Sequence, residues 1–143
     1  MAGLEKGAPL PTNIVVHAVT RALEVAFDDG KTFRFPFEFL RVYSPSAEVR
    51  GHGPGQEVLQ VGKRDVVIEA VEPVGHYAIQ PRFSDGHDSG IYSWDYLYWL
   101  GAKHSELWLE YLERLKAAGE SRGGAEPAAS VALKATELRR PRS

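Results

Sequence analysis

The chain has 143 residues, no cysteine and a formal net charge of −2, a size that suits one domain. Without cysteine it forms no disulfide and supplies neither a thiolate nucleophile nor a sulfur ligand for zinc or an iron–sulfur cluster. No stretch approaches the roughly 18 consecutive apolar residues of a membrane helix, and the N-terminus lacks the apolar run of a secretion signal. We therefore expect a cytoplasmic protein that does not bind membranes.

The charge is divided unevenly along the chain. Residues 120–143 hold five lysines and arginines against three glutamates, whereas the remainder carries a net charge of −4. Proteins that bind nucleic acids usually present a concentrated basic face. A weakly acidic body with a short basic tail favours no nucleic-acid ligand.

Three apolar segments near the N-terminus predict strands over Ile14–Ala18, Ala22–Phe27 and Thr32–Phe35, because β-branched and apolar residues alternate with polar ones. Between the last two, Asp28-Asp29-Gly30 is typical of a tight hairpin turn. Pro36 ends the third strand, and the bulky residues Phe37–Val42 indicate a short helix.

The middle of the chain predicts a loop followed by another hairpin. Residues 44–62 are polar and rich in glycine, and Val66–Val71 and His76–Phe83 have the composition of strands, joined through Pro73 and Gly75. We predict an α+β fold with a small, mainly antiparallel sheet of four or five strands and C-terminal helices packed against it.

Two helices are expected after the sheet. Ser93 can cap a helix that begins at Trp94, and apolar residues at helical spacing from Leu107 to Leu115 predict a second, ended by Gly119. The later residues bury too little apolar surface to offset the cost of ordering. The predicted organisation is a flexible lead-in over 1–12, a domain over 13–101, a C-terminal helix over 102–119 and a disordered tail over 120–143.

Two segments of unusual composition carry a resemblance to a known family. Phe83–Leu97 gathers acids, a histidine and large aromatic residues around two glycines, and Leu40–Gly53 reads Leu-Arg-Val-Tyr-Ser-Pro-Ser-Ala-Glu-Val-Arg-Gly-His-Gly. Both, in this order, resemble signatures of the gamma-butyrobetaine hydroxylase-like N-terminal domain family, with similarity from about Asn13 to Gly101. In the full hydroxylases an oxygenase domain with iron and 2-oxoglutarate follows. Fewer than about 45 residues remain here, so we expect only the accessory domain and no enzyme activity.

The resemblance also implies where a metal site has been lost. In the hydroxylases this module holds a structural zinc through three cysteines and a histidine, which correspond to Ser44, Ser46, Val49 and His87. Serine is a poor zinc ligand beside imidazole and valine offers no lone pair. We expect the fold to stand without the metal, through apolar burial alone.

The charged residues of the two signature segments allow several arrangements. Arg41 can pair with Asp85 or Asp88 and tie the segments together. His87 with Asp85 and Asp88 can form a weak iron or zinc site, since one imidazole and two carboxylates suit either metal. Alternatively, Asp85 and Ser89 organise the turn by bonding backbone amides while His87 bonds a neighbouring strand.

Aromatic residues are frequent between residues 92 and 111 and can serve either a binding surface or the core. Tyr98 and Trp99 are adjacent in a predicted helix and cannot both face the same core, so we expect one of them to be exposed. The set comprises Tyr92, Trp94, Tyr96, Tyr98, Trp99, Trp108 and Tyr111.

The sequence favours a non-catalytic accessory or interaction module, with Arg41, Asp85, His87, Asp88, Tyr92 and Trp94 as candidate binding residues. Family association suggests an oxygenase or an iron–sulfur assembly protein as partner. The alternative is a protein that binds iron or zinc through His87 and neighbouring carboxylates. An enzyme acting through Asp85, His87 and Asp95 lacks a recognisable nucleophile and pocket in the sequence.

Overall fold

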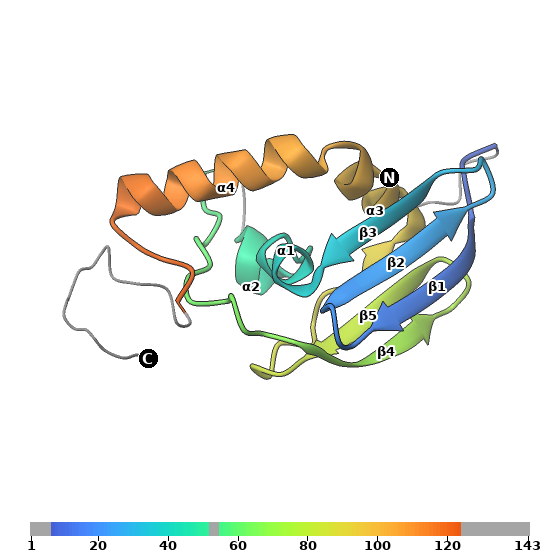
Figure 1. Cartoon of the computed structure of the whole chain (residues 1–143), viewed down its shortest axis with the longest axis horizontal. Helices are drawn as coiled ribbons and strands as arrows, with labels where there is room; N and C mark the ends of the chain where they lie inside the picture. The colour runs from blue at the N-terminus through green and yellow to red at the C-terminus, as the bar shows by residue number, and fades with distance from the viewer. Residues whose placement is uncertain (1–6, 52–54, 124–143) are drawn as a thin grey trace.

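A computed structural model describes residues 7–51 and 55–123, so the predicted tail beyond Gly123 and the lead-in before Gly7 lie outside the described residues. Along the chain in Figure 1, three strands are followed by two helices, and this order then repeats. The elements in order are β1 (Pro11–His17), β2 (Ala22–Phe27), β3 (Thr32–Pro36), α1 (Phe37–Val42), α2 (Ala47–Arg50), β4 (Ile68–Val74), β5 (Ala78–Phe83), β6 (Tyr92–Ser93), α3 (Trp94–Ala102) and α4 (His104–Ala118).

The first three strands form an antiparallel sheet in the order β1-β2-β3. The predicted hairpin is confirmed: Gly30 has φ of 90°, a left-handed conformation that glycine adopts without steric cost. Alternation in β2 places Leu23, Val25 and Phe27 in the core. Strand β1 begins at Pro11, slightly before the expected start of order at Asn13.

The prediction of one sheet of four or five strands is wrong in detail, because the described residues form two three-stranded sheets. The second has the order β4-β5-β6, with Tyr92 pairing with Ile79 and Ser93 with Ala78. A strand of two residues carries no periodic pattern, so β6 could not be recognised from sequence. The α+β class is confirmed.

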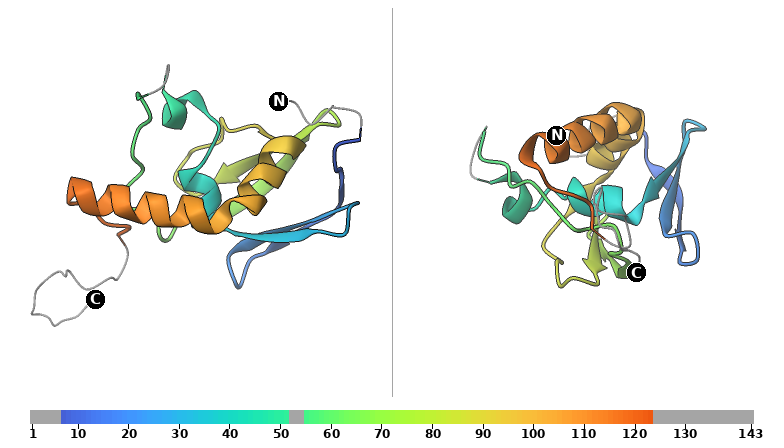
Figure 2. Two further views of the ribbon diagram at one scale, coloured as in Figure 1. Left: turned by 90° about the horizontal axis from the view of Figure 1, so that it is seen from above. Right: turned by 60° about the vertical axis from the view of Figure 1, so that its left-hand side comes forward.

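Figures 1 and 2 show the two sheets next to each other, and both contribute side chains to one hydrophobic core. Leu23 and Phe35 come from the first sheet, and Ile79 and Phe83 from the second. Every residue of α1 is buried, and Phe37, Phe39 and Leu40 belong to this core. Burying a leucine or phenylalanine side chain contributes about 1.5–3 kcal/mol, so this shared core holds the two sheets together.

Helix α3 begins as predicted, with the Ser93 hydroxyl accepting a hydrogen bond from the backbone N–H of Tyr96 at 3.2 Å. It runs past Gly101, where the Phe33 ring occupies the space that a side chain would need. Helix α4 ends at Gly119, which has φ of 70°. In Figure 1 α4 extends beyond the sheets and over α1. None of the described helices is long and apolar enough to cross a membrane.

The described chain after α4 folds back against the body. The N–H groups of Gly62 and Arg64 donate to the carbonyls of Ser121 and Arg122, and the Arg122 guanidinium makes two bonds, of 2.8 and 2.6 Å, to the buried carboxylate of Glu38. A buried carboxylate needs such a counter-charge. Regular contacts therefore continue into the first residues of the region expected to be disordered.

Candidate functional site

The two signature segments meet in the structure, and an ion pair between Arg41 and Asp85 joins them as predicted. Arg41 Nε donates to Asp85 Oδ2 at 2.9 Å, and its Nη1 donates to the Gln60 side chain at 2.9 Å. The Arg41 side chain is only 8% exposed. The alternative partner, Asp88, is exposed; its backbone carbonyl accepts a bond from Gln80.

Asp85 is also held by Lys63, whose ammonium donates to Oδ2 at 2.7 Å. Burial by itself raises the pKa of this carboxyl, but the Lys63 hydrogen bond, the Arg41 charge and the His87 N–H outweigh it and lower the pKa to about 2. The carboxylate is thus ionised and shared between two cations. Its bond from the backbone N–H of His87, at 3.3 Å, confirms the expected role in the turn.

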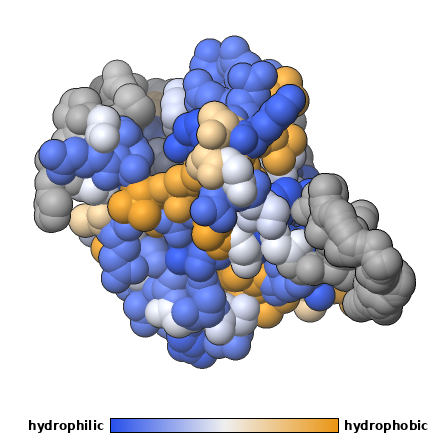
Figure 3. All heavy atoms as spheres, turned by 90° about the vertical axis from the view of Figure 1, so that its left-hand side faces the viewer, coloured by the Kyte–Doolittle hydropathy of each residue, from blue (hydrophilic) through white to orange (hydrophobic). Residues whose placement is uncertain are grey.

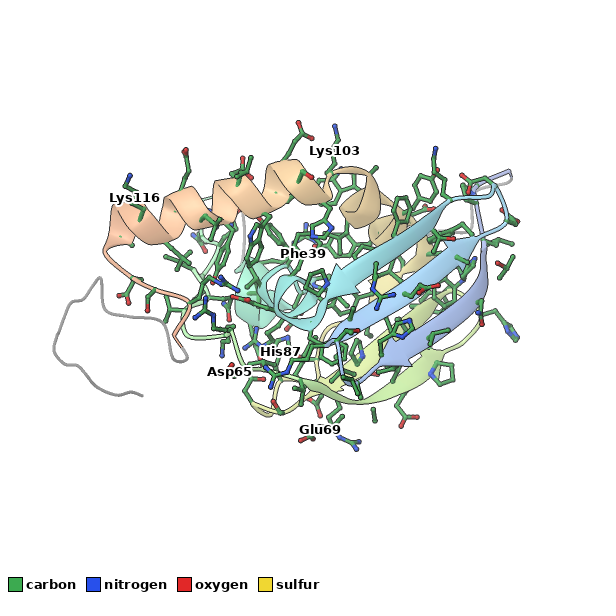
Figure 4. All side chains as sticks on the ribbon, in the orientation of Figure 1. Phe39, Asp65, Glu69, His87, Lys103 and Lys116 are labelled. Atoms are coloured by element: carbon green, nitrogen blue, oxygen red, sulfur yellow. The ribbon has the colours of Figure 1, made fainter. Side chains whose placement is uncertain are left out.

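His87 belongs to the second signature segment and bonds residues of the first; Figure 4 shows it below Phe39. Its Nε2 is 2.8 Å from Ser44 Oγ and its Nδ1 is 2.9 Å from Glu48 Oε1. The expected hydrogen bond from His87 to a neighbouring strand is therefore wrong for the imidazole ring. The ring instead bonds Glu48 on α2 and Ser44, which precedes that helix. Burial and the Arg41 charge lower the pKa of His87, while Glu48 and Asp85 act in the opposite direction.

Serine hydroxyls also connect the two signature segments. Ser46 Oγ lies 2.7 Å from Ser89 Oγ and caps α2 by accepting from the N–H of Glu48 at 3.1 Å. A side chain at Gly90 would collide with the Ser44 hydroxyl, so glycine permits this close approach. We call this set the polar latch: Arg41, Ser44, Ser46, Glu48, Asp85, His87 and Ser89.

The residues do not fit a metal site. The described part of the chain holds no group of three or more histidines and acids that could bind an ion. Both ring nitrogens of His87 are hydrogen-bonded, and Asp85 is bound by two cations. Hydrogen bonds are found where the family resemblance places zinc. They stabilise the fold together with apolar burial, which we had expected to be the sole contribution.

The order Ser44, His87, Glu48 has the connectivity of a nucleophile, a base and an orienting acid. Ser44 is only 1% exposed, however, and its oxygen also receives the N–H of Ser46 at 3.2 Å. Gly90 packs directly against it. In this arrangement the serine hydroxyl is enclosed by protein groups, which bind it through hydrogen bonds. Sequence reasoning missed Glu48, whose only signal was its position just after the cap of α2.

Two predicted binding residues lie in the core instead of on a surface. Tyr92 is 0% exposed and its hydroxyl donates to the carbonyl of Leu40. Trp94 is 9% exposed and its indole N–H donates to the carbonyl of His76 at 2.8 Å. Their hydrogen bonds satisfy the polar atom that each buries, so both residues serve packing.

A pocket of about 470 Å³ lies beside the latch, between α2, residues 57–60 and helices α3 and α4. Sequence reasoning missed it, because its walls come from segments far apart along the chain. Trp99 at its edge is 43% exposed, which confirms that one of Tyr98 and Trp99 faces outward. The lining residues are Val42, Tyr43, Ser44, Val49, Arg50, Glu57, Val58, Gln60, Tyr96, Trp99, Leu107, Glu110, Tyr111 and Arg114.

The tyrosine hydroxyls of the pocket are used within the protein. Tyr43 donates to the carbonyl of Leu107 at 2.6 Å and Tyr111 to that of Gln60 at 2.7 Å, while Tyr96 donates to the carbonyl of Tyr43. Burial raises the pKa of Tyr96 and of Tyr111 to about 12, so both stay neutral. What the pocket offers a ligand is therefore ring surface and the charges at its rim.

Apolar surface is also exposed at the pocket, since Val58, a lining residue on the segment after α2, is 53% exposed. Leu109, on α4, is 63% exposed but does not line the pocket. The end of the molecule that carries this segment and α4 shows a band of apolar side chains between polar ones (Figure 3). Exposed apolar surface rimmed by polar groups is typical of interaction sites.

Comparison with known proteins relates most of the described chain to one family. Residues 14–98 match the family described as gamma-butyrobetaine hydroxylase-like, N-terminal. Two proteins solved by NMR in solution are each 44% identical with a TM-score of 0.73; one match covers 87% of this chain and 98% of the other, and the second covers 91% and 97%.

A crystal structure of a protein of unknown function from Acidithiobacillus ferrooxidans is 42% identical with a TM-score of 0.55, over 64% of this chain and 92% of that one. No curated protein matches the sequence. The match to the family model extends over more than half of the chain and includes both signature segments. The chain belongs to the gamma-butyrobetaine hydroxylase-like N-terminal family.

Proposed function

We propose that this chain is a non-catalytic, cytoplasmic interaction module that binds a protein partner in the pocket beside the polar latch. By family association the partner is an oxygenase or an iron–sulfur assembly protein. The observation that carries the proposal is the open pocket of about 470 Å³, whose aromatic walls are not closed over by the described chain.

The residue types of the pocket support binding of a protein. Tyr96, Trp99, Tyr111, Arg50 and Arg114 belong to the types that dominate binding energy at protein interfaces. Tyr96 stacks on Trp99 with ring centroids 5.8 Å apart and an interplanar angle of 27°. Such mutual packing holds the exposed indole in place before binding, which lowers the entropic cost of association.

The polar latch supports a scaffolding role in place of catalysis. Its charged and polar groups bind one another across the two signature segments. Catalytic groups, by contrast, keep a nucleophile or base within reach of a substrate. The latch also orders Ser44 and Val49, which line one wall of the pocket.

The test compares two exposed apolar residues on the helices. Trp99 lines the pocket whereas Leu109, more exposed still, does not. A captured oxygenase or cluster-assembly protein is purified, and its dissociation constant is measured by titration calorimetry with the wild type, Trp99→Ala and Leu109→Ala. We expect Trp99→Ala to weaken binding at least about tenfold, as for a hot-spot aromatic residue, and Leu109→Ala to change it by less than about twofold.

Two results would overturn the proposal. One is an equal loss of affinity in both variants, which would place the interface elsewhere. The other is a specific partner that belongs to neither class of protein, which would remove the association with oxygenases and cluster assembly. Circular dichroism of each variant checks that the fold is intact.

A further inference from the structure

We infer that the partner inserts an apolar side chain flanked by carboxylates into the pocket, with Arg50 and Arg114 receiving the acidic groups. The inference rests on the proposed function and specifies the chemistry of the partner. It starts from the two guanidiniums, which reach the pocket from α2 and from α4.

Both arginines are positioned but lack an acidic partner. The Arg50 guanidinium lies 5.9 Å from the centroid of the Tyr96 ring, and that of Arg114 lies 5.9 Å from the Tyr43 ring. Arg114 also donates to the Tyr43 hydroxyl at 3.3 Å. Within the described part of the chain, no carboxylate lies within 4.0 Å of either group. A guanidinium placed over a ring keeps its N–H edge for a carboxylate.

The floor of the pocket selects an apolar group. The hydroxyls of Tyr43, Tyr96 and Tyr111 already donate to backbone carbonyls. Burying a polar group without a hydrogen-bond partner is unfavourable, so an inserted side chain without polar atoms is favoured. The volume falls within the range of sites that enclose small ligands, which leaves room for a phenylalanine-sized group.

Glu57 and Glu110 line the same pocket and oppose an acidic partner. Glu110 lies one helical turn before Arg114 on α4, so the two residues affect an incoming carboxylate with opposite sign. Replacing Arg114 should weaken binding and replacing Glu110 should strengthen it. Neither effect is expected if the pocket binds its partner through apolar contacts alone.

The experiment uses two peptide probes, acetyl-Glu-Phe-Glu-amide and its uncharged analogue acetyl-Gln-Phe-Gln-amide, titrated into the full chain. Binding is followed by the NMR shift of the Trp99 indole N–H at low salt, where exposed charges are least screened. We expect the acidic peptide to bind at least about threefold more tightly, as exposed ion pairs allow, and Arg50→Gln with Arg114→Gln to abolish the difference.

Two further variants test whether charges at the pocket change the affinity for the acidic peptide in the expected direction. Glu110→Gln should bind the acidic peptide about twofold more tightly. Arg82→Gln is the matched control, because Arg82 is exposed on β5 beside Glu69 and does not line the pocket. It should leave both affinities unchanged.

Equal binding of the two peptides, or no change in the arginine variants, would overturn the assignment of charge but leave protein docking through Trp99 intact. Binding of 3-phenylpropionate as tight as that of the acidic peptide would assign the pocket to a small acid. That result would overturn both the inference and the proposed function.

Discussion

The polar latch and the neighbouring pocket share a wall but use polar groups in opposite ways. In the latch, Arg41, Asp85 and His87 each find partners inside the molecule. In the pocket, Arg50 and Arg114 rest on aromatic rings, and Trp99 remains substantially exposed.

The difference separates residues that hold the fold from residues that remain free to bind. A charged group that is already neutralised gains little from a ligand and loses much when its partner is removed. An exposed aromatic residue contributes little to folding but can bury its surface against a partner. Substitutions in the two regions should therefore separate stability from binding.

The largest effect on stability is expected from Arg41→Ala. It removes one of the two cations bound to Asp85, leaving Lys63, and it removes a bond to Gln60, so we expect a loss of about 2 kcal/mol in the free energy of unfolding. Urea denaturation measures it, with Arg82→Ala as a surface control that should change stability by less than about 0.5 kcal/mol. Equal stability of the two variants would show that the latch does not hold the segments together.

His87→Gln tests the centre of the latch, with an expected loss of about 1–2 kcal/mol at pH 7.5 from a buried ring that bridges Ser44 and Glu48. Because the pKa of His87 is lowered below 6.5 in the fold, the unfolded chain binds the proton more readily. The stability due to neutral His87 is therefore full above pH 6.5 and declines as the pH falls below it.

Urea denaturation between pH 7.5 and 5.5 measures this decline, which should be shallower in His87→Gln. Burial also lowers the pKa of His104, so His104→Gln provides the comparison for a histidine outside the latch. An unchanged slope in His87→Gln would contradict the assigned protonation state.

Trp99→Ala should hardly affect the fold, with a change in unfolding free energy below about 1 kcal/mol, because the indole is 43% exposed. The same variant is expected to lose partner binding. Thermal unfolding by circular dichroism gives the first quantity and calorimetry the second. A large loss of stability would show that Trp99 contributes to the core and not only to a binding surface.

The smallest expected effect is that of metal removal. Since His87 and Asp85 are occupied by protein partners, a chelator should leave the melting temperature of the untagged protein unchanged, and elemental analysis should find no stoichiometric iron or zinc. A metal that is retained in the wild type and lost in His87→Ala would favour the alternative function.

Local patterns made several elements predictable. The hairpin around Gly30, the buried alternation of β2 and the Ser93 cap of α3 follow from interactions between residues close in the chain. The pair between Arg41 and Asp85 could be inferred because the two signature segments carry opposite charges at these positions. Other features, namely the split into two sheets, the short strand β6 and the role of Glu48, were not predictable, since they depend on pairings across distant segments.

By itself, the sequence determined most of the strands and helices, the fold class and the lack of sulfur ligands, because these depend on composition and on periodicities within a few residues. Only the tertiary structure decided that His87 is enclosed by Ser44 and Glu48 and that Tyr92 is core. It also decided that Arg50 and Arg114 meet at one pocket. Whether a polar side chain is satisfied or available depends on neighbours that only folding brings near, and that availability separates the latch from the pocket.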